Sequence, residues 1–206
     1  MKIITRTTAI LNLKKYIGQD IRKLAKNYKI TSFETGKQNK GWKGLVLERL
    51  AGLENNVSKA PNGLNFELKS VSFKYKNEDL VPKETMAITM INQKELLDNG
   101  FYGSHCWAKL KSVVFCAVMW HGKNAAKAEL LNVTSFDFSK DDILIKEIKA
   151  DYDFIREKLK TKGFDSLTGR DGKWIQARTK GSGHGSKTRA FYARKALVKK
   201  IFENSK

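Results

Sequence analysis

The sequence predicts an α/β or α+β protein in which a central mixed β-sheet is flanked by helices. Stretches with apolar residues at helical intervals lie near both ends of the chain, and several strand-like stretches lie between them. The chain has only two prolines, which favours continuous elements over a loop-rich scaffold. A length of 206 residues fits one domain, or two lobes sharing a core, with a sizeable interior.

The first third of the chain alternates helix, loop and helix. Apolar residues at helical intervals, among them Ile10, Leu13 and Ile17, predict a helix over 8–28. The polar stretch "TSFETGKQNKG" predicts a loop over 31–41. A second helix is predicted over 42–53, where "WKGLVLERLAGL" supplies leucines for packing.

A change of period at residue 64 predicts the first strand, over 64–73. In "LNFELKSVSF", Phe66 and Leu68 would face one way, and Glu67 and Lys69 the other. The remaining predicted elements are strands over 85–91, 112–120, 128–134 and 173–180, and helices over 140–161 and 190–203.

Charge points to a polyanionic partner. The chain carries a formal net charge of +19, while 41% hydrophobic and 10% aromatic residues exclude a disordered basic tail. The N-terminal apolar run meets Lys14 and Lys15 too soon for a signal peptide, and no run reaches transmembrane length. We expect a soluble cytoplasmic protein that has no membrane partner, with Cys106 and Cys116 as ordinary reduced residues.

The Glu67–Lys69 pair is the first candidate for chemistry. A carboxylate and an ammonium on one strand face could serve a hard metal such as Mg²⁺ and an attacking water. Glu48, in the preceding predicted helix, could bring a further carboxylate. Such pairs are also common on half-buried strands as solvated residues, so the spacing alone does not establish a site.

The surrounding residues resemble a known family. "NKGWKGLVLERLAG" followed by "PNGLNFELKSVSF" is similar to the active-site region of the MutH mismatch-repair endonuclease and of MutH-like type II restriction endonucleases, in the PD-(D/E)xK superfamily. The resemblance implies catalytic roles for Glu48, Glu67 and Lys69. "SHCWAKLKSVVFCAVMW" resembles the family's segment with an auxiliary active-site lysine, here Lys109. The resemblance to the family also implies a restriction-endonuclease-like fold with two lobes forming a DNA-binding cleft.

The C-terminal segment "GKWIQARTKG…FYARKALVKKIF" resembles the family's DNA-reading region, which implies base contacts by Arg178, Lys180 and Tyr192. Independently, residues 173–200 hold nine Lys or Arg and no acid. Glycines let a backbone approach phosphates, and arginine can bind guanine bidentately. This basic segment adds His184, Lys187 and Arg189 as DNA-binding candidates. Lys40 and Lys43, which precede the predicted active site in the chain, are further candidates.

The chain departs from the family at one acid. The family has an Asp before Glu-x-Lys, and its interval from the helix Glu falls on Asn62; a longer Asp-to-Glu spacing would select Ala60. The resemblance therefore assigns Asn62, Glu48 and Glu67 as catalytic residues and as metal ligands. Unlike the two glutamates, Asn62 lacks the negative charge that holds a divalent cation. Two hypotheses stay open: Asn62 inactivates the site, or the two glutamates suffice. We expect inactivation.

Together these features predict a sequence-specific, Mg²⁺-dependent type II restriction endonuclease that cuts double-stranded DNA and leaves 5′-phosphate ends. A mismatch-repair nickase that needs an activating protein, and a non-catalytic DNA-binding protein, are the alternatives. We expect one domain over 1–206, with a catalytic lobe over about 1–135 and a DNA-reading lobe over about 136–206. Monomer and homodimer both stay open.

Overall fold

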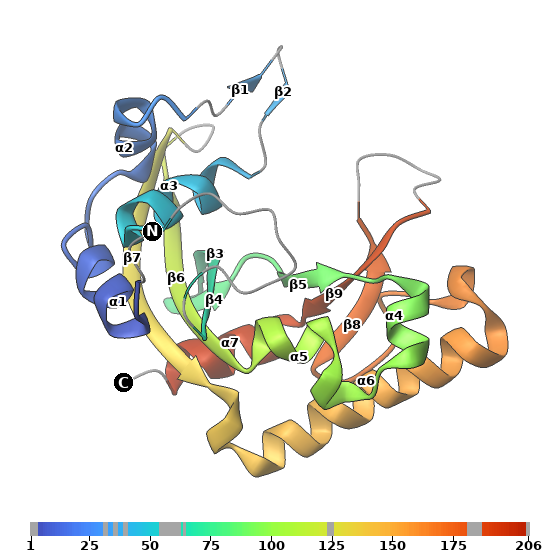
Figure 1. Ribbon diagram of the computed structural model, residues 1–206. Coiled ribbons are helices and arrows are strands. Elements are labelled where there is room, and N and C mark those ends of the chain that lie inside the picture. Colours follow the sequence, from blue (N-terminus) through green and yellow to red (C-terminus); the bar gives the residue numbers. More distant parts are fainter. Residues whose placement is uncertain are drawn as a thin grey trace. The chain divides into compact units, whose positions relative to one another are not determined.

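The computed structural model describes residues 4–30, 33–34, 37–38, 41–53, 63, 65–122, 126–180 and 187–204 (Figure 1). Its helices are α1 (Arg6–Lys14), α2 (Ile21–Asn27), α3 (Trp42–Ala51), α4 (Gln93–Asp98), α5 (His105–Leu110), α6 (Asp142–Lys162) and α7 (Lys195–Glu203). Its strands are β1 (Phe33–Glu34), β2 (Lys37–Gln38), β3 (Glu67–Lys76), β4 (Asp79–Pro82), β5 (Met86–Met90), β6 (Ser112–His121), β7 (Lys127–Asp137), β8 (Ile175–Thr179) and β9 (Arg189–Ala193). The predicted α/β architecture with a mixed sheet is confirmed.

Two compact units make up the chain. The first comprises residues 1–84, 113–136 and 202–206, and the second comprises 85–112 and 137–201. This differs from the predicted division at about residue 135, because residues 85–112 belong with the C-terminal part. They connect β3 to β6, which are parallel, and parallel strands need a long crossover.

The first unit is built on a four-stranded mixed sheet of order β4-β3-β6-β7. β3 pairs with β4 in antiparallel and with β6 in parallel orientation. β6 is buried from Ser112 to Met119, which explains its nearly continuous apolar sequence. The sheet therefore holds β3 between two neighbours and gives it two distinct faces.

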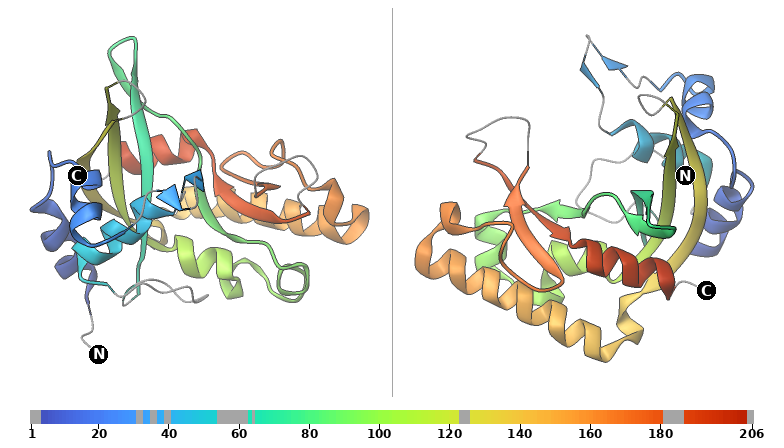
Figure 2. Two further views of the ribbon diagram at one scale, coloured as in Figure 1. Left: turned by 90° about the horizontal axis from the view of Figure 1, so that it is seen from above. Right: turned by 180° about the vertical axis from the view of Figure 1, so that it is seen from behind.

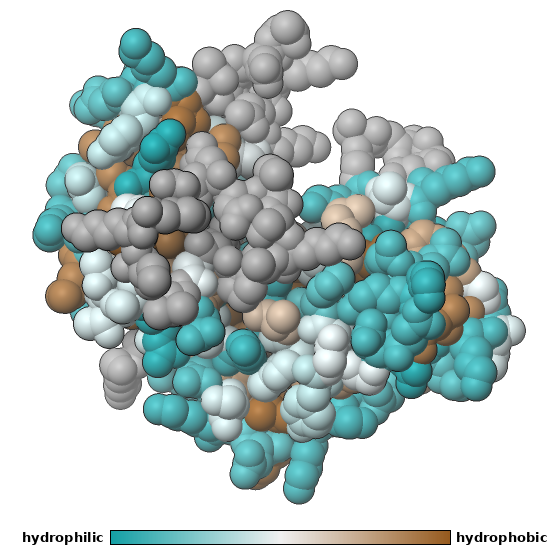
Figure 3. Space-filling model, viewed as in Figure 1, coloured by the Kyte–Doolittle hydropathy of each residue, from teal (hydrophilic) through white to brown (hydrophobic). Residues whose placement is uncertain are grey.

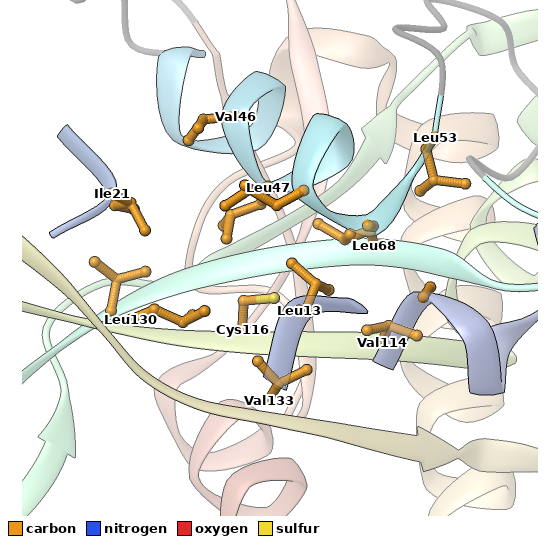
Figure 4. Packing of buried hydrophobic residues seen from close by; sticks show 14 of the residues in the cluster. Leu13, Ile21, Val46, Leu47, Leu53, Leu68, Val114, Cys116, Leu130 and Val133 are labelled. Carbon is orange, nitrogen blue, oxygen red and sulfur yellow. The ribbon is translucent and has the colours of Figure 1, made fainter. Parts of the chain in front are cut away.

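Helices cover one face of this sheet (Figure 4). Leu13 of α1 and Leu47 of α3 pack with Leu68 of β3 and with Val114 and Cys116 of β6. Burial raises the pKa of the Cys116 thiol to about 12, so this residue is a protonated core side chain. Cys106, in the second unit, is also free and buried, as expected for ordinary reduced cysteines.

The second unit is built on a three-stranded antiparallel sheet of order β5-β9-β8, with β9 in the middle. The long helix α6 packs against β8, and the ring of Tyr152 on α6 stacks on Phe191 of β9 with centroids 5.5 Å apart. The β8–β9 hairpin and α6 can be followed in both views of Figure 2. One face of the sheet is thus covered by α6.

Two elements depart from their sequence prediction at the N-terminal end. The single helix predicted over 8–28 is two helices, because Gly18 and Gln19 exchange backbone hydrogen bonds with Leu130 of β7. Gly18 adopts a φ of +83°, and the Asp20 side chain caps α2 at the amide of Arg22. The predicted 31–41 loop contains the short β1–β2 hairpin.

The helix predicted over 190–203 begins only at Lys195. Residues 189–193 form β9 instead, because they are paired on both sides, with β5 and with β8. This two-sided pairing outweighs the helical spacing of their apolar residues. The short elements β4, α4 and α5 were not predicted.

A buried carboxylate anchors the entry to β8. Asp151 of α6 is 7% exposed and accepts hydrogen bonds from the amides of Lys173, Trp174 and Ile175, at 2.7, 2.6 and 2.9 Å. Three charge-assisted bonds offset the cost of burying the carboxylate. They tie the start of β8 to the middle of α6.

Hydrophilic residues dominate the coloured part of the face shown in Figure 3, with small apolar patches between them. Within the described ranges, no helix is both long and apolar enough to cross a lipid bilayer.

We predict that Asp151→Ala lowers the free energy of unfolding by about 3 kcal/mol, because three consecutive backbone amides, one of them buried, lose their acceptor. Chemical denaturation at neutral pH measures the change. The matched control is Asp153→Ala on the same helix, whose carboxylate forms an exposed ion pair with Lys149 and whose loss should cost less than about 0.5 kcal/mol. Equal effects of the two substitutions would contradict the anchoring role.

Candidate functional site

Glu67 and Lys69 form an ion pair at the start of β3. The Lys69 Nζ donates to the Glu67 Oε1 at 2.9 Å, and the side chains are 16% and 4% exposed. Their neighbours Phe66 and Leu68 pack into the helix-covered core, so the predicted division of faces is correct. The pair therefore lies on the sheet face opposite α1 and α3.

Stability does not account for this pair. Taking two charges out of water costs about as much as their attraction returns, so apolar residues of similar size would serve the fold as well. An acid and a lysine kept together in a buried position are therefore a candidate for chemistry.

A tight turn leads into the pair. The Gly63 amide donates to the Phe66 carbonyl at 3.1 Å, and Asn65 between them has a φ of +60°. A Cβ at Gly63 would lie 2.2 Å from the Phe66 ring, so the turn requires glycine there. Phe66, which immediately precedes Glu67, is thus hydrogen-bonded to Gly63, which immediately follows position 62.

The helix that carries Glu48 packs beside this turn. Leu47 and Leu50 of α3 share a core cluster with Phe66 and Leu68, which flank Glu67 in the chain. Glu48 itself is half-buried. The arrangement brings the Glu48 helix to the strand end that carries Glu67.

These residues suit a divalent cation only in part. Carboxylates are the ligands that Mg²⁺ takes, and Glu48 and Glu67 supply two. Over the part of the chain that the structure describes, no three or more His, Cys, Asp or Glu gather as a metal site. Asn62, the third predicted ligand, lies outside the described residues, as does Ala60, and its amide carries no charge.

Lys43, predicted to contact DNA, is held within the first unit. Its Nζ donates to Ser72 Oγ at 2.7 Å and to Glu84 Oε1 at 3.2 Å, and it lies over the Trp120 ring at 5.4 Å. Trp120 Nε1 also donates to Ser72 Oγ, at 2.8 Å. These contacts fasten α3 to β3, and a DNA contact by Lys43 stays a prediction.

The contacts with Lys43 and Ser72 change the pKa of the Glu84 carboxyl. Although partial burial raises the pKa of its carboxyl, the Lys43 ammonium and hydrogen bonds from Ser72 lower it below the ordinary value of 4.5 overall. The network could not be predicted from the sequence, because Lys43, Ser72, Glu84 and Trp120 are far apart in the chain.

Lys109 is in the last turn of α5, in the second unit. Along the chain it precedes Val113, the β6 residue paired with Glu67, by four positions. Its auxiliary catalytic role stays a prediction.

The predicted DNA-reading residues lie on the β8–β9 hairpin. Arg178 of β8 and Lys180, which directly follows the strand, are exposed, and the Arg178 guanidinium lies 5.2 Å from the centre of the Tyr192 ring. Arg178 also donates to Thr85 Oγ1 at 3.4 Å. The face opposite α6 is therefore cationic and partly aromatic.

The other predicted DNA contacts differ in position. Lys187 is exposed just before β9. Arg189 is 8% exposed, donates to the Leu167 carbonyl at 3.2 Å and lies over the Phe164 ring. Its side chain therefore connects β9 to residues 164–167 of the same unit. Lys40 and His184 lie outside the described residues.

β3 and the helix α3 that contacts it thus supply two carboxylates and an ammonium, with Glu67 buried and with Lys69 and Glu48 half-buried. Residues 53–151, slightly less than half of the chain, match the family described as DNA mismatch repair enzyme MutH. The matched stretch includes Asn62, Glu67, Lys69 and Lys109, and it excludes Glu48 and the basic C-terminal segment. The resemblance to MutH-like endonucleases is thereby confirmed.

Among solved structures, the chain is similar to one titled "Restriction endonuclease MvaI-cognate DNA substrate complex". The identity is 12%, the similarity covers 98% of this chain and 97% of that chain, and the TM-score is 0.37. At so low a score the similarity supports no further argument. A search of curated proteins found no match.

We predict that Lys69→Met alone lowers the free energy of unfolding by roughly 3 kcal/mol, because the buried Glu67 loses its ammonium partner. Glu67→Leu combined with Lys69→Met should bring stability back to within about 1 kcal/mol of the parent. Denaturant titration at neutral pH measures both. Lys94→Ala, which removes an exposed ion pair with Asp98, serves as the control and should change little. A double variant as unstable as the single one would mean that the pair is there for stability.

A pH-dependent prediction concerns Glu84. Because its folded-state pKa is depressed, its contribution to stability is present above the ordinary value of 4.5 and is lost as pH falls through the lower folded-state value. Glu84→Gln should therefore be slightly less stable than the parent at pH 7, by under about 1 kcal/mol because the side chain is half exposed. The difference between the unfolding temperatures of the two proteins should shrink as the pH is lowered below 4.5, and a constant difference would refute this.

Proposed function

We propose that this chain has the architecture of a sequence-specific, Mg²⁺-dependent endonuclease for double-stranded DNA. The observation that carries the proposal is the ion pair between the buried Glu67 and the half-buried Lys69, which lies inside the segment that matches the MutH family. The net charge of +19 and the cationic face of the β8–β9 hairpin supply attraction for a DNA duplex.

The residues divide the work of phosphodiester hydrolysis. Glu67, Glu48 and position 62 would hold Mg²⁺, which stabilises charge on the phosphate and makes a bound water more acidic. Lys69, fixed by Glu67, would orient the attacking water for in-line attack at phosphorus. The 3′ oxygen leaves, so the cut ends carry 5′ phosphates.

Asn62 makes this chain a weak catalyst or an inactive one. An amide oxygen can coordinate a cation but does not offset its charge, so the site lacks one of its few anionic ligands. DNA binding depends on other residues and should survive. A non-catalytic DNA-binding protein on the same scaffold is therefore the second candidate, and Asn62 is the residue that favours it.

Within the nuclease class we favour a restriction endonuclease. The high positive charge supports DNA binding without a recruiting protein. A mismatch-repair nickase would instead depend on an activating partner, and the family match is compatible with it.

We predict that Asn62→Asp raises Mg²⁺-dependent DNA cleavage by at least about 100-fold over the parent chain, since it restores a charged ligand. The measurement is cleavage of a supercoiled plasmid pool by purified protein in Mg²⁺, with EDTA as the blank. Linear product indicates a restriction endonuclease, and product that stops at the nicked circle indicates a nickase.

Two controls define the result. Glu67→Gln in the Asn62→Asp background should abolish the gained activity, and Asp153→Ala in the same background should leave it unchanged. If the parent chain cuts as fast as the Asn62→Asp variant, the inactivation is refuted. If neither cuts any duplex although both are folded, the nuclease assignment itself fails.

A further inference from the structure

The arginines of the second unit fall into two groups. Arg156, Arg189 and Arg194 donate to backbone carbonyls of their own unit and hold its loops. Arg178 and Arg170 are exposed. Among the described residues, no hydrogen bond or ion pair engages the Arg170 guanidinium. Arg170 is not among the predicted DNA contacts, because it lies outside the basic segment that begins at Lys173.

Arg170 lies on a turn that is held from several directions. The Asp171 carboxylate accepts from the Thr168 amide at 2.7 Å and from Lys158 Nζ at 2.7 Å. The Arg194 guanidinium donates to the carbonyls of Gly169, Asp171 and Gly172, at 2.9, 3.1 and 2.9 Å. Hydrogen bonds thus hold the backbone of the turn on both sides of Arg170.

The next residues are anchored as well. Asp151 binds three consecutive amides that begin at Lys173, immediately after the turn. Little conformational freedom of the backbone remains to be lost when the turn meets a ligand, so a contact by the Arg170 side chain would be preorganised.

The turn stands beside Arg178. A Cβ placed on Gly169 would lie 3.6 Å from the Arg178 Cβ and 3.6 Å from the Gln176 Oε1. Gln176 and Arg178 point to the β8 face that is opposite α6. Arg170 and Arg178 therefore start from neighbouring backbone on one surface of the same unit.

We propose that Arg170 is a specificity-determining residue that contacts a base edge in the DNA duplex, next to the contact made by Arg178. This rests on the proposed function, since it assumes a DNA ligand for this surface. The guanidinium fork matches the two acceptors of guanine in the major groove, and fixed presentation on a rigid turn suits such a directional contact. A phosphate contact needs only charge and gains little from a fixed, directional presentation.

The test is selection of binding sites from a random duplex library, with Ca²⁺ in place of Mg²⁺ so that binding is scored without cleavage. The parent chain, Arg170→Ala, Arg170→Lys and the charge-matched control Lys160→Ala are compared. The parent should select a defined motif. Arg170→Ala should lose the preference at one base pair and bind the selected site about 10- to 100-fold more weakly, while binding a scrambled duplex as before. Arg170→Lys should fail to restore the preference, and Lys160→Ala should keep it.

Three results would overturn the proposal. If Arg170→Ala selects the parent motif with the affinity of Lys160→Ala, Arg170 does not touch the DNA, and the proposed function stands. If Arg170→Ala weakens selected and scrambled duplexes alike and flattens the salt dependence, Arg170 binds a phosphate instead. If the folded parent binds no duplex at all, the proposed function falls together with this inference. Circular dichroism and thermal unfolding of each variant establish that it is folded.

Discussion

The parallel pairing of β3 with β6 is the constraint on which the rest of the structure depends. Parallel neighbours cannot be joined by a hairpin, so the chain leaves the first sheet after β4 and returns only at Ser112. That excursion supplies β5, α4 and α5 to the second unit. The same pairing sets Glu67 opposite Val113 and Lys69 opposite Phe115, so the polar pair is held by a buried strand on one side.

Burial gives the pair its significance. Val71 and Phe73 continue the same face of β3 and are fully buried, which leaves Glu67 and Lys69 as charges at the end of an apolar surface. A fold under selection for stability alone would gain nothing from them. Just before the pair in the chain, Gly63 is bridged to Phe66, the residue that immediately precedes Glu67.

Local sequence predicted much of this and could not predict the rest. The alternation in "LNFELKSVSF" correctly separated Phe66 and Leu68 from Glu67 and Lys69, because a half-buried strand leaves a period of two. The break at Gly18 and the strand at 189–193 depend on pairing with residues that are remote in sequence, β7 in one case and β5 in the other. The same holds for the hydrogen bonds that Lys43 and Arg189 make within their own units, because the partners Ser72 and Leu167 are remote in sequence; the DNA contacts of both residues stay predictions. The rigid turn at Arg170 was missed because its anchors, Asp151 and Arg194, lie outside it.

Under the proposed function, the amide of Asn62 leaves the proposed Mg²⁺ site of Glu48 and Glu67 short of one anionic ligand. Titration of Mn²⁺ into the protein bound to duplex DNA, followed by electron paramagnetic resonance of the free ion, tests this most directly. We expect Asn62→Asp to bind Mn²⁺ at least about 10-fold more tightly than the parent, and adding Glu67→Gln to remove the gain. Equal Mn²⁺ binding by the parent and by Asn62→Asp would refute a missing anionic ligand at position 62.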